Sequence, residues 1–161
     1  MLTKCRMGLF VVFVMCMSMS VQAAQSNVFK LTANNSMDKV YPSVYKALED
    51  VNFFVVFEPF ISKSISRFEE KWGDEYNKNK LDSIRSMVFC NGWYANKVSN
   101  IDPEMLALCP LRIGLYEKAG KTTIVFARPT VIAAQSNALS VLREVESKII
   151  NAIKSGVKGA N

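Results

Sequence analysis

The sequence predicts an α+β fold, a single-layer, mainly antiparallel sheet with helices packed against it. Three observations indicate this fold class. Short β-prone runs alternate along the chain with segments whose apolar residues recur with a helical period. A short glycine-containing loop joins two of these runs as an antiparallel hairpin. Residues 24–161, about 138 in number, suit one domain with a single hydrophobic core.

The first 23 residues have the three-part layout of a secretory signal peptide. Two basic residues open the segment, residues 8–17 form an apolar run, and Val21 and Ala23 place small residues at −3 and −1 of a cleavage site after Ala23. The apolar run is shorter than the ~20 residues that a membrane-spanning helix needs. We therefore expect cleavage, no stable membrane anchor, and a periplasmic or secreted protein.

The composition excludes several classes of function, because the chain contains no histidine. Ser-His-Asp and Cys-His nucleophile pairs, His-rich metal sites and His-ligated haem all need an imidazole. Loss of Lys4 and Arg6 with the signal peptide lowers the formal charge from +6 to +4. The remaining basic residues are interleaved with acidic ones, so no basic stripe indicates a nucleic-acid partner. We expect a non-enzymatic protein without catalytic residues, cofactor or metal.

The first part of the chain predicts two strands and a helix between them. Residues 27–33 alternate roughly between the two faces expected of a strand. Ser36 is expected to cap an amphipathic helix, and Pro42 predicts either a kink in this helix or a start at Tyr41. The apolar run FFVVF at 53–57 predicts a buried second strand.

The middle of the chain predicts a second helix, a charged loop and a third strand. Apolar residues recur at helical spacing over 61–71, and Gly73 can end that helix. The acidic residues around the loop 74–82 lack the spacing of a cation site and indicate a solvated helix end. Residues 83–90 predict the third strand, and Asn91-Gly92 turns the chain into a short helical segment.

The last part of the chain predicts a helical turn, a hairpin and a final helix. Residues 102–108 are expected to form the turn, with proline at its first position. Strands at 111–117 and 122–127 form the antiparallel hairpin. A final amphipathic helix is expected to begin at a cap on Ser136 and to end at Gly156.

Several short motifs together resemble a known protein family. They are FCN at 89–91, LCP at 108–110, LYE at 115–117 and RP at 128–129. Over about residues 27–154 the chain resembles the bacterial and archaeal family named domain of unknown function 302. The resemblance implies a compact α+β domain that can self-associate as a homodimer and has no assigned activity. Two positions depart from the family pattern, because Leu111 replaces its second cysteine and Arg128 replaces its acidic residue before the last proline.

Cys90 and Cys109, the two cysteines of the predicted mature chain, are the strongest candidates for chemistry. An even number of thiols in an oxidising compartment favours a structural disulfide, which would stabilise the fold by roughly 3 kcal/mol through its loop of about 20 residues. Two buried free thiols are one alternative. A redox or soft-metal pair is another, for which Met105 can share a face with Cys109 whereas Met87 should point away from Cys90.

The residues that follow the third strand form the candidate binding site. Trp93 and Tyr94 can wall a small apolar pocket, with Asn91 and Arg128 as polar contacts, or the two aromatic rings can instead cap the edge of the core. The sequence therefore leaves two classes of function. One is an exported, non-enzymatic accessory module that binds a small ligand or a periplasmic partner protein. The other is a thiol-dependent redox or soft-metal-handling protein that uses the cysteine pair.

Overall fold

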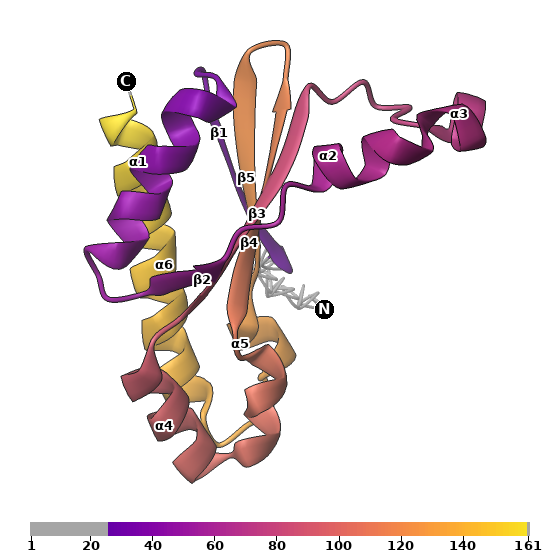
Figure 1. Cartoon of the computed structure of the whole chain (residues 1–161). Helices are drawn as coiled ribbons and strands as arrows, with labels where there is room; N and C mark the ends of the chain where they lie inside the picture. Colours follow the sequence, from indigo (N-terminus) through magenta and orange to yellow (C-terminus); the bar gives the residue numbers. More distant parts are fainter. Residues whose placement is uncertain (1–25, 161) are drawn as a thin grey trace, which may run out of the picture.

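A computed structural model of the chain describes residues 26–160, and the predicted signal peptide lies outside the described residues (Figure 1). Five strands form one antiparallel sheet in the order β1-β5-β4-β3-β2. The strands are β1 (Val28–Ala33), β2 (Phe54–Phe57), β3 (Ser83–Cys90), β4 (Leu111–Lys118) and β5 (Lys121–Ala127). The predicted α+β class and antiparallel sheet are confirmed.

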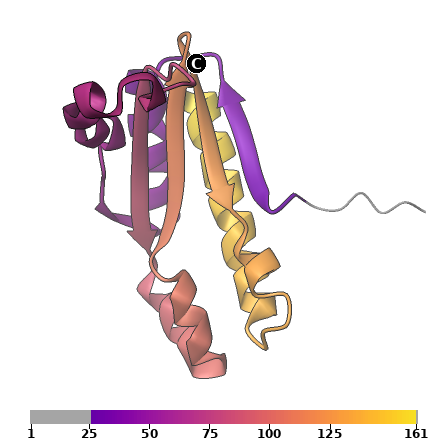
Figure 2. The same cartoon turned by 90° about the vertical axis from the view of Figure 1, so that its right-hand side faces the viewer.

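Two long helices cover one face of this sheet, namely α1 (Met37–Glu49) and α6 (Leu139–Gly159). They pack side by side, and Figure 2 views the sheet from the opposite face, with both helices behind the strands. The shorter helices are α2 (Ile61–Ile65), α3 (Glu69–Trp72), α4 (Gly92–Ile101) and α5 (Pro129–Ile132), and the 3-10 turns are η1 (Ser66–Phe68), η2 (Gly73–Glu75) and η3 (Pro103–Leu108).

The hydrophobic core lies between the sheet and the two long helices. Alternate residues of the three central strands point inward and are almost fully buried: Met87, Phe89, Ile113, Leu115, Ile124 and Phe126. The apolar face predicted for the last helix is buried throughout: Ala138, Leu142, Val145, Ile149 and Ile153. The helix itself begins at Leu139, three residues after Ser136, whose Oγ accepts a hydrogen bond from the Ala138 N–H at 3.0 Å.

Gly156 does not end α6, contrary to the sequence prediction, because the helix continues to Gly159. The glycine is instead the point of closest approach between α6 and α1. A Cβ atom at position 156 would lie 2.6 Å from the Val44 Cα and 3.0 Å from the Ser43 carbonyl oxygen. The Ser43 Oγ also donates a 2.7 Å hydrogen bond to the Gly156 carbonyl. The absence of a side chain therefore lets the two helix backbones touch.

The start of α1 follows the prediction, although the capping contact differs. Ser36 is the N-cap residue but makes no side-chain cap bond, and the Met37 N–H donates instead to a carboxylate oxygen of Glu117 at 2.8 Å. Pro42 lies inside the helix, so the predicted alternative of a start at Tyr41 is wrong. Because Tyr41 is buried against the core, tertiary packing favours helix there despite the following proline.

The prediction of a buried second strand is wrong. Within the described residues β2 pairs with β3 alone and forms an edge of the sheet. Phe54 and Phe57 are 54% and 63% exposed, and the buried aromatic ring belongs to Phe53, which precedes the strand. The run FFVVF has the composition of a central strand, but its place at an edge follows from the order of the strands.

The single helix predicted over 61–71 divides into α2, η1 and α3, and α3 ends at Gly73 as expected. Residues 61–75 project from the sheet as an arm, and none of these residues is buried (Figure 1). The Phe68 and Trp72 rings stack on each other with their centroids 5.1 Å apart. The apolar residues that recur at helical spacing in this segment therefore lie on the arm and not in the core.

Candidate functional site

The two cysteines meet at one end of the sheet. Cys90 is the last residue of β3, and Cys109 lies just before β4. Because Phe89 pairs with Leu111 in the antiparallel ladder, the end of β3 and the start of β4 lie side by side. The Sγ atoms of the two free thiols are 3.5 Å apart and in hydrogen-bond contact. A disulfide has an S–S distance of about 2.05 Å, so a small movement of the side chains would bring the sulfurs within bonding distance.

A small apolar cavity adjoins the thiol pair. Its volume is about 40 Å³, and its lining includes Phe53, Phe89, Tyr94, Met105 and Leu142 besides both cysteines. A space of this size can hold a water molecule, whereas sites for drug-sized molecules commonly measure about 300–1,000 Å³. This cavity beside the cysteines is therefore too small for an organic molecule of that size.

The electrostatic surroundings of the pair disfavour nucleophilic chemistry. Partial burial of the Cys109 thiol, with a further contribution from its hydrogen bond to Cys90, raises the pKa of Cys109 to about 11. The attacking species in thiol chemistry is the thiolate, and reactive cysteines have lowered pKa values. Cys109 is therefore a protonated thiol near neutral pH, which disfavours the redox-catalyst form of the thiol hypothesis.

Protein recovered from the periplasm of an expressing cell is expected to begin at Ala24 and to weigh two hydrogens less than its reduced form. The sulfur contact and the loop-closure stabilisation of roughly 3 kcal/mol both favour a disulfide between Cys90 and Cys109 in an oxidising compartment. Intact mass spectrometry without reductant measures the cleavage site and the bond together. Two alkylatable thiols would contradict the disulfide, and retention of the first 23 residues would contradict export.

Asn91 positions the segment that follows Cys90. It is the N-cap of α4, and its Oδ1 accepts a hydrogen bond from the Tyr94 N–H at 3.1 Å. Its Nδ2 donates to the Asn52 carbonyl oxygen at 2.8 Å. Both ends of the amide are therefore engaged in protein contacts, and Asn91 ties the start of α4 to the loop before β2.

The two aromatic residues predicted to wall a pocket both line a groove beside β2, but they differ in burial. Tyr94 stacks on Phe53 with ring centroids 5.8 Å apart, and its hydroxyl donates to the Glu144 carboxylate on α6. Burial, aided by this hydrogen bond, raises the pKa of Tyr94 to about 12. Trp93 is 65% exposed, with the Lys97 Nζ 5.7 Å from its ring centroid. Tyr94 therefore caps the edge of the core, and Trp93 is left for external contacts.

Trp93 borders an open groove beside the edge strand. The groove has a volume of about 440 Å³ and is lined by Val51, Asn52, Phe54, Asn91, Gly92, Trp93, Tyr94 and Lys148. It combines apolar walls with amide groups and one cation. We name the exposed apolar residues of this region, Phe54, Val56, Phe57 and Trp93, the β2 edge surface. The sequence analysis indicated Trp93 but not the three residues of β2, because the strand pattern predicted their burial.

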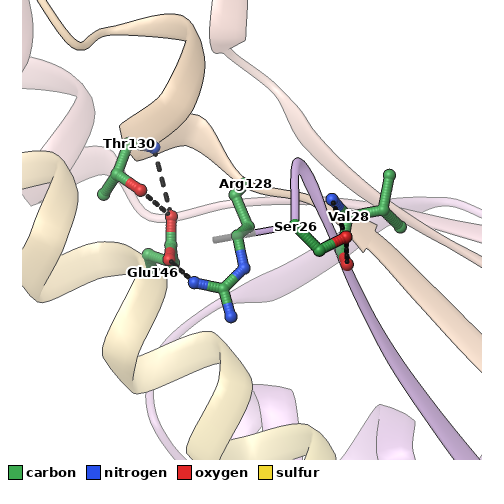
Figure 3. A network of polar contacts seen from close by, with 5 residues as sticks. All are labelled: Ser26, Val28, Arg128, Thr130 and Glu146. Carbon is green, nitrogen blue, oxygen red and sulfur yellow. Dashed lines mark hydrogen bonds and ion pairs between the residues drawn. The ribbon is translucent and has the colours of Figure 1, made fainter. Parts of the chain in front are cut away.

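Arg128 does not join Asn91 and Trp93, and it lines neither the cavity nor the groove described above. Its Nη1 donates to an oxygen of Glu146 on α6 at 3.1 Å. The other Glu146 oxygen accepts from the Thr130 N–H at 3.1 Å and from the Thr130 hydroxyl at 2.6 Å (Figure 3). The side chains of Arg128 and Glu146 are only 17% and 9% exposed. This pair ties the end of β5 and the start of α5 to α6.

Glu146 was missed by sequence reasoning, although its position carries a signal. It lies four residues after Leu142 and three before Ile149, both buried, and this spacing puts an acidic side chain on the apolar face of a helix. A carboxylate in such a place needs a cation or hydrogen-bond donors. Arg128 and Thr130 supply both.

Within residues 26–160, no group of three or more His, Cys, Asp or Glu side chains is placed to hold a metal ion. No helix in the same range is long and apolar enough to cross a membrane.

These observations define a small α+β protein in which two long helices cover one face of a five-stranded antiparallel sheet and a thiol pair lies at the end of that sheet. The chain belongs to the family described as Domain of unknown function DUF302, which matches residues 29–156. The resemblance based on the short motifs is thereby confirmed.

The fold is similar to that of a solved structure, the crystal structure of uncharacterized conserved protein DUF302 from Bacillus stearothermophilus. The TM-score is 0.69 and the sequence identity 14%, over 81% of this chain and 98% of that chain. At this identity the likeness shows the fold alone. No curated protein matches the chain.

Proposed function

We propose that the protein is an exported, non-enzymatic accessory module that binds an extended segment of a partner protein along the β2 edge surface. The observation that supports this proposal best is an uncharged edge strand that exposes two phenylalanines, one of which, Phe54, lines a groove together with the exposed Trp93. Export is supported by the three-part N-terminal segment.

The two edges of the sheet differ in chemistry. β1 carries Lys30, and charged side chains of this kind discourage the addition of further strands. β2 has no charged residue between Phe54 and Phe57, and its apolar side chains are exposed. An edge strand offers its outward main-chain groups to an extended segment, which can add to the sheet as a further strand. The composition of β2 therefore favours a complex in which a segment of the partner protein covers this edge strand.

The groove beside β2 provides a place for an anchoring side chain of the partner. Phe54 and Trp93 form its apolar walls, and Asn52, Asn91 and Lys148 add polar groups. Protein interfaces commonly bury aromatic residues at their centre within a polar rim. The groove has about eleven times the volume of the cavity beside the cysteines, about 440 Å³ against about 40 Å³. The groove is open and adjoins the exposed edge strand, and this arrangement favours an extended protein segment over an enclosed small ligand.

Peptides selected from a displayed library of random ten-residue sequences by the mature protein are expected to need the β2 edge surface. Phe54→Ala and Trp93→Ala should each weaken binding of the selected peptides by at least about tenfold, because truncation of a central aromatic residue removes more than about 1.4 kcal/mol. Ile132→Ala is a matched control, since Ile132 is 61% exposed on α5 and lies outside this surface. Calorimetric titration measures the affinities.

Two results would contradict this proposal. Equal affinity of the selected peptides for the wild type and Trp93→Ala would show that the surface is not used. A wild-type dimer that Phe54→Ala converts to a monomer in sedimentation experiments would show that a second copy of the chain, and not a partner protein, covers the edge. Hydrogen exchange provides an independent readout, because an added strand should protect the amides of β2.

A further inference from the structure

We infer that the reduced thiols of Cys90 and Cys109, together with the thioether of Met105, form a binding site for one copper(I) ion. This site lies at the end of β3 and is separate from the edge strand. It does not depend on the partner-binding proposal. The inference concerns the dithiol form of the protein, whereas the predicted disulfide concerns its oxidised form.

Three sulfur-containing residues from separate parts of the chain line one cavity. Cys90 ends β3, Cys109 precedes β4, and Met105 lies in η3. The two thiol sulfurs are in contact at 3.5 Å, and all three residues line the same cavity. Met87, the other methionine near Cys90 in sequence, is fully buried in the core beneath the sheet and does not line this cavity. The fold therefore selects Met105 as the third donor.

The donor set favours copper(I) over other common ions. Soft thiolate and thioether ligands select Cu(I). Structural zinc sites require four Cys, His or carboxylate ligands, and calcium and magnesium require several oxygen ligands. The chain contains no histidine, and within residues 26–160 no cluster of three or more His, Cys, Asp or Glu is placed for a metal. A site of two thiols and one thioether thus has too few ligands for zinc and no oxygen ligands for calcium or magnesium. It suits a soft monovalent cation.

The surroundings support a bound cation. The residues that line the cavity around the three sulfur donors are apolar apart from Asn91 and the Tyr94 hydroxyl, and none carries a charged side chain among those described. The apolar lining on one side of the sulfurs lowers the local dielectric and strengthens the attraction between a cation and two thiolates. Cys109 is exposed and Cys90 is partly exposed, so an ion can reach the sulfurs from solvent.

Binding conserves atoms and charge without electron transfer. Two S–H bonds break, two Cu–S bonds form, and the two protons pass to solvent. The resulting site of two thiolates and one Cu(I) ion carries a single negative charge. Oxidation of the cysteines to a disulfide removes both thiolates, so only the dithiol form is expected to bind copper. The oxidised protein, which has the same sequence but no free thiols, is therefore the control for copper binding by the dithiol form.

The test uses the mature protein, fully reduced by a phosphine and then freed of reductant under anaerobic conditions. Titration with Cu(I) against a chromophoric chelator should show one ion per chain. Cys90→Ser and Cys109→Ser should each lower the affinity by at least about a hundredfold, and Met105→Leu should lower it by about tenfold, because each removes a soft donor. Met87→Leu, a similar change at a methionine outside the cavity, should leave the affinity unchanged.

Spectroscopy and the oxidised protein complete the test. X-ray absorption at the copper edge should show sulfur-only coordination with two thiolates and a third, weaker sulfur. Trp93→Ala should retain copper binding, which separates this inference from the proposed partner interaction. Equal copper affinity of the disulfide form, or of Cys90→Ser, would overturn the site. An unchanged affinity of Met105→Leu would overturn the three-sulfur arrangement. Circular dichroism of each variant excludes loss of folding as the cause.

Discussion

Replacement of Glu146 by alanine is expected to lower the free energy of unfolding by about 3–5 kcal/mol, the range observed when one member of a buried ion pair is removed. The change leaves the Arg128 guanidinium without its carboxylate. It also leaves the N–H and hydroxyl of Thr130 without their common acceptor. Glu146→Gln retains an oxygen acceptor of similar shape and is expected to have a smaller effect. Chemical denaturation measures both variants.

Asp50→Ala is the control for Glu146→Ala. Asp50 also pairs with a cation, since the Lys46 Nζ lies 2.6 Å from its carboxylate, but both side chains are largely exposed. Exposed pairs contribute only about 0–1 kcal/mol, because solvent screens them. A loss at Glu146 no larger than the loss at Asp50 would show that the contacts of Glu146 do not stabilise the fold.

Replacement of Gly156 by alanine is expected to destabilise the protein by about 2 kcal/mol, because the added methyl group would overlap the backbone of α1. The nearest atom, the Val44 Cα, cannot rotate away as a side chain would. Alanine has the higher intrinsic helix propensity by about 1 kcal/mol, so an isolated helix would respond in the opposite direction. The sign of the measured change therefore separates helix packing from helix propensity.

Gly92→Ala is the matched control for Gly156→Ala. Gly92 also lies in a helix, α4, but apart from its chain neighbours and the backbone of its own helix no atom lies within 4 Å of the position that its Cβ would take. Thermal and chemical denaturation should show a neutral or slightly stabilised protein. A stabilised Gly156→Ala variant would contradict the close contact between α1 and α6.

Local patterns predicted those parts of the fold that depend on neighbours in sequence. The bounds of β3, residues 83–90, and the hairpin of β4 and β5 follow from strand composition and a short glycine loop, and the structure confirms both. The order of the strands depends on pairings between distant segments. The exposure of Phe54 and Phe57 follows from that order, so the apolar run alone could not reveal it.

The sequence likewise predicted those residues of the candidate site that are close to one another along the chain. Cys90, Asn91 and Tyr94 are consecutive or nearly so, and the structure places them together with Cys109. The meeting of the two cysteines depends on the pairing of β3 with β4, which the sequence pattern does not specify. Arg128 lies elsewhere because a buried acidic partner on α6 binds it.

The pairing of β1 with β5 has a consequence for the time at which the chain can fold. Thr32 and Thr123, 91 positions apart, share a 2.9 Å hydrogen bond across these two strands. High contact order slows folding, because the entropy of closing a long loop is lost before the contact forms. The sheet is incomplete until β5, which ends at Ala127, is available. In the proposed exported protein, the first strand to cross the membrane would wait for the last, and β5 would have to cross before the native sheet closes.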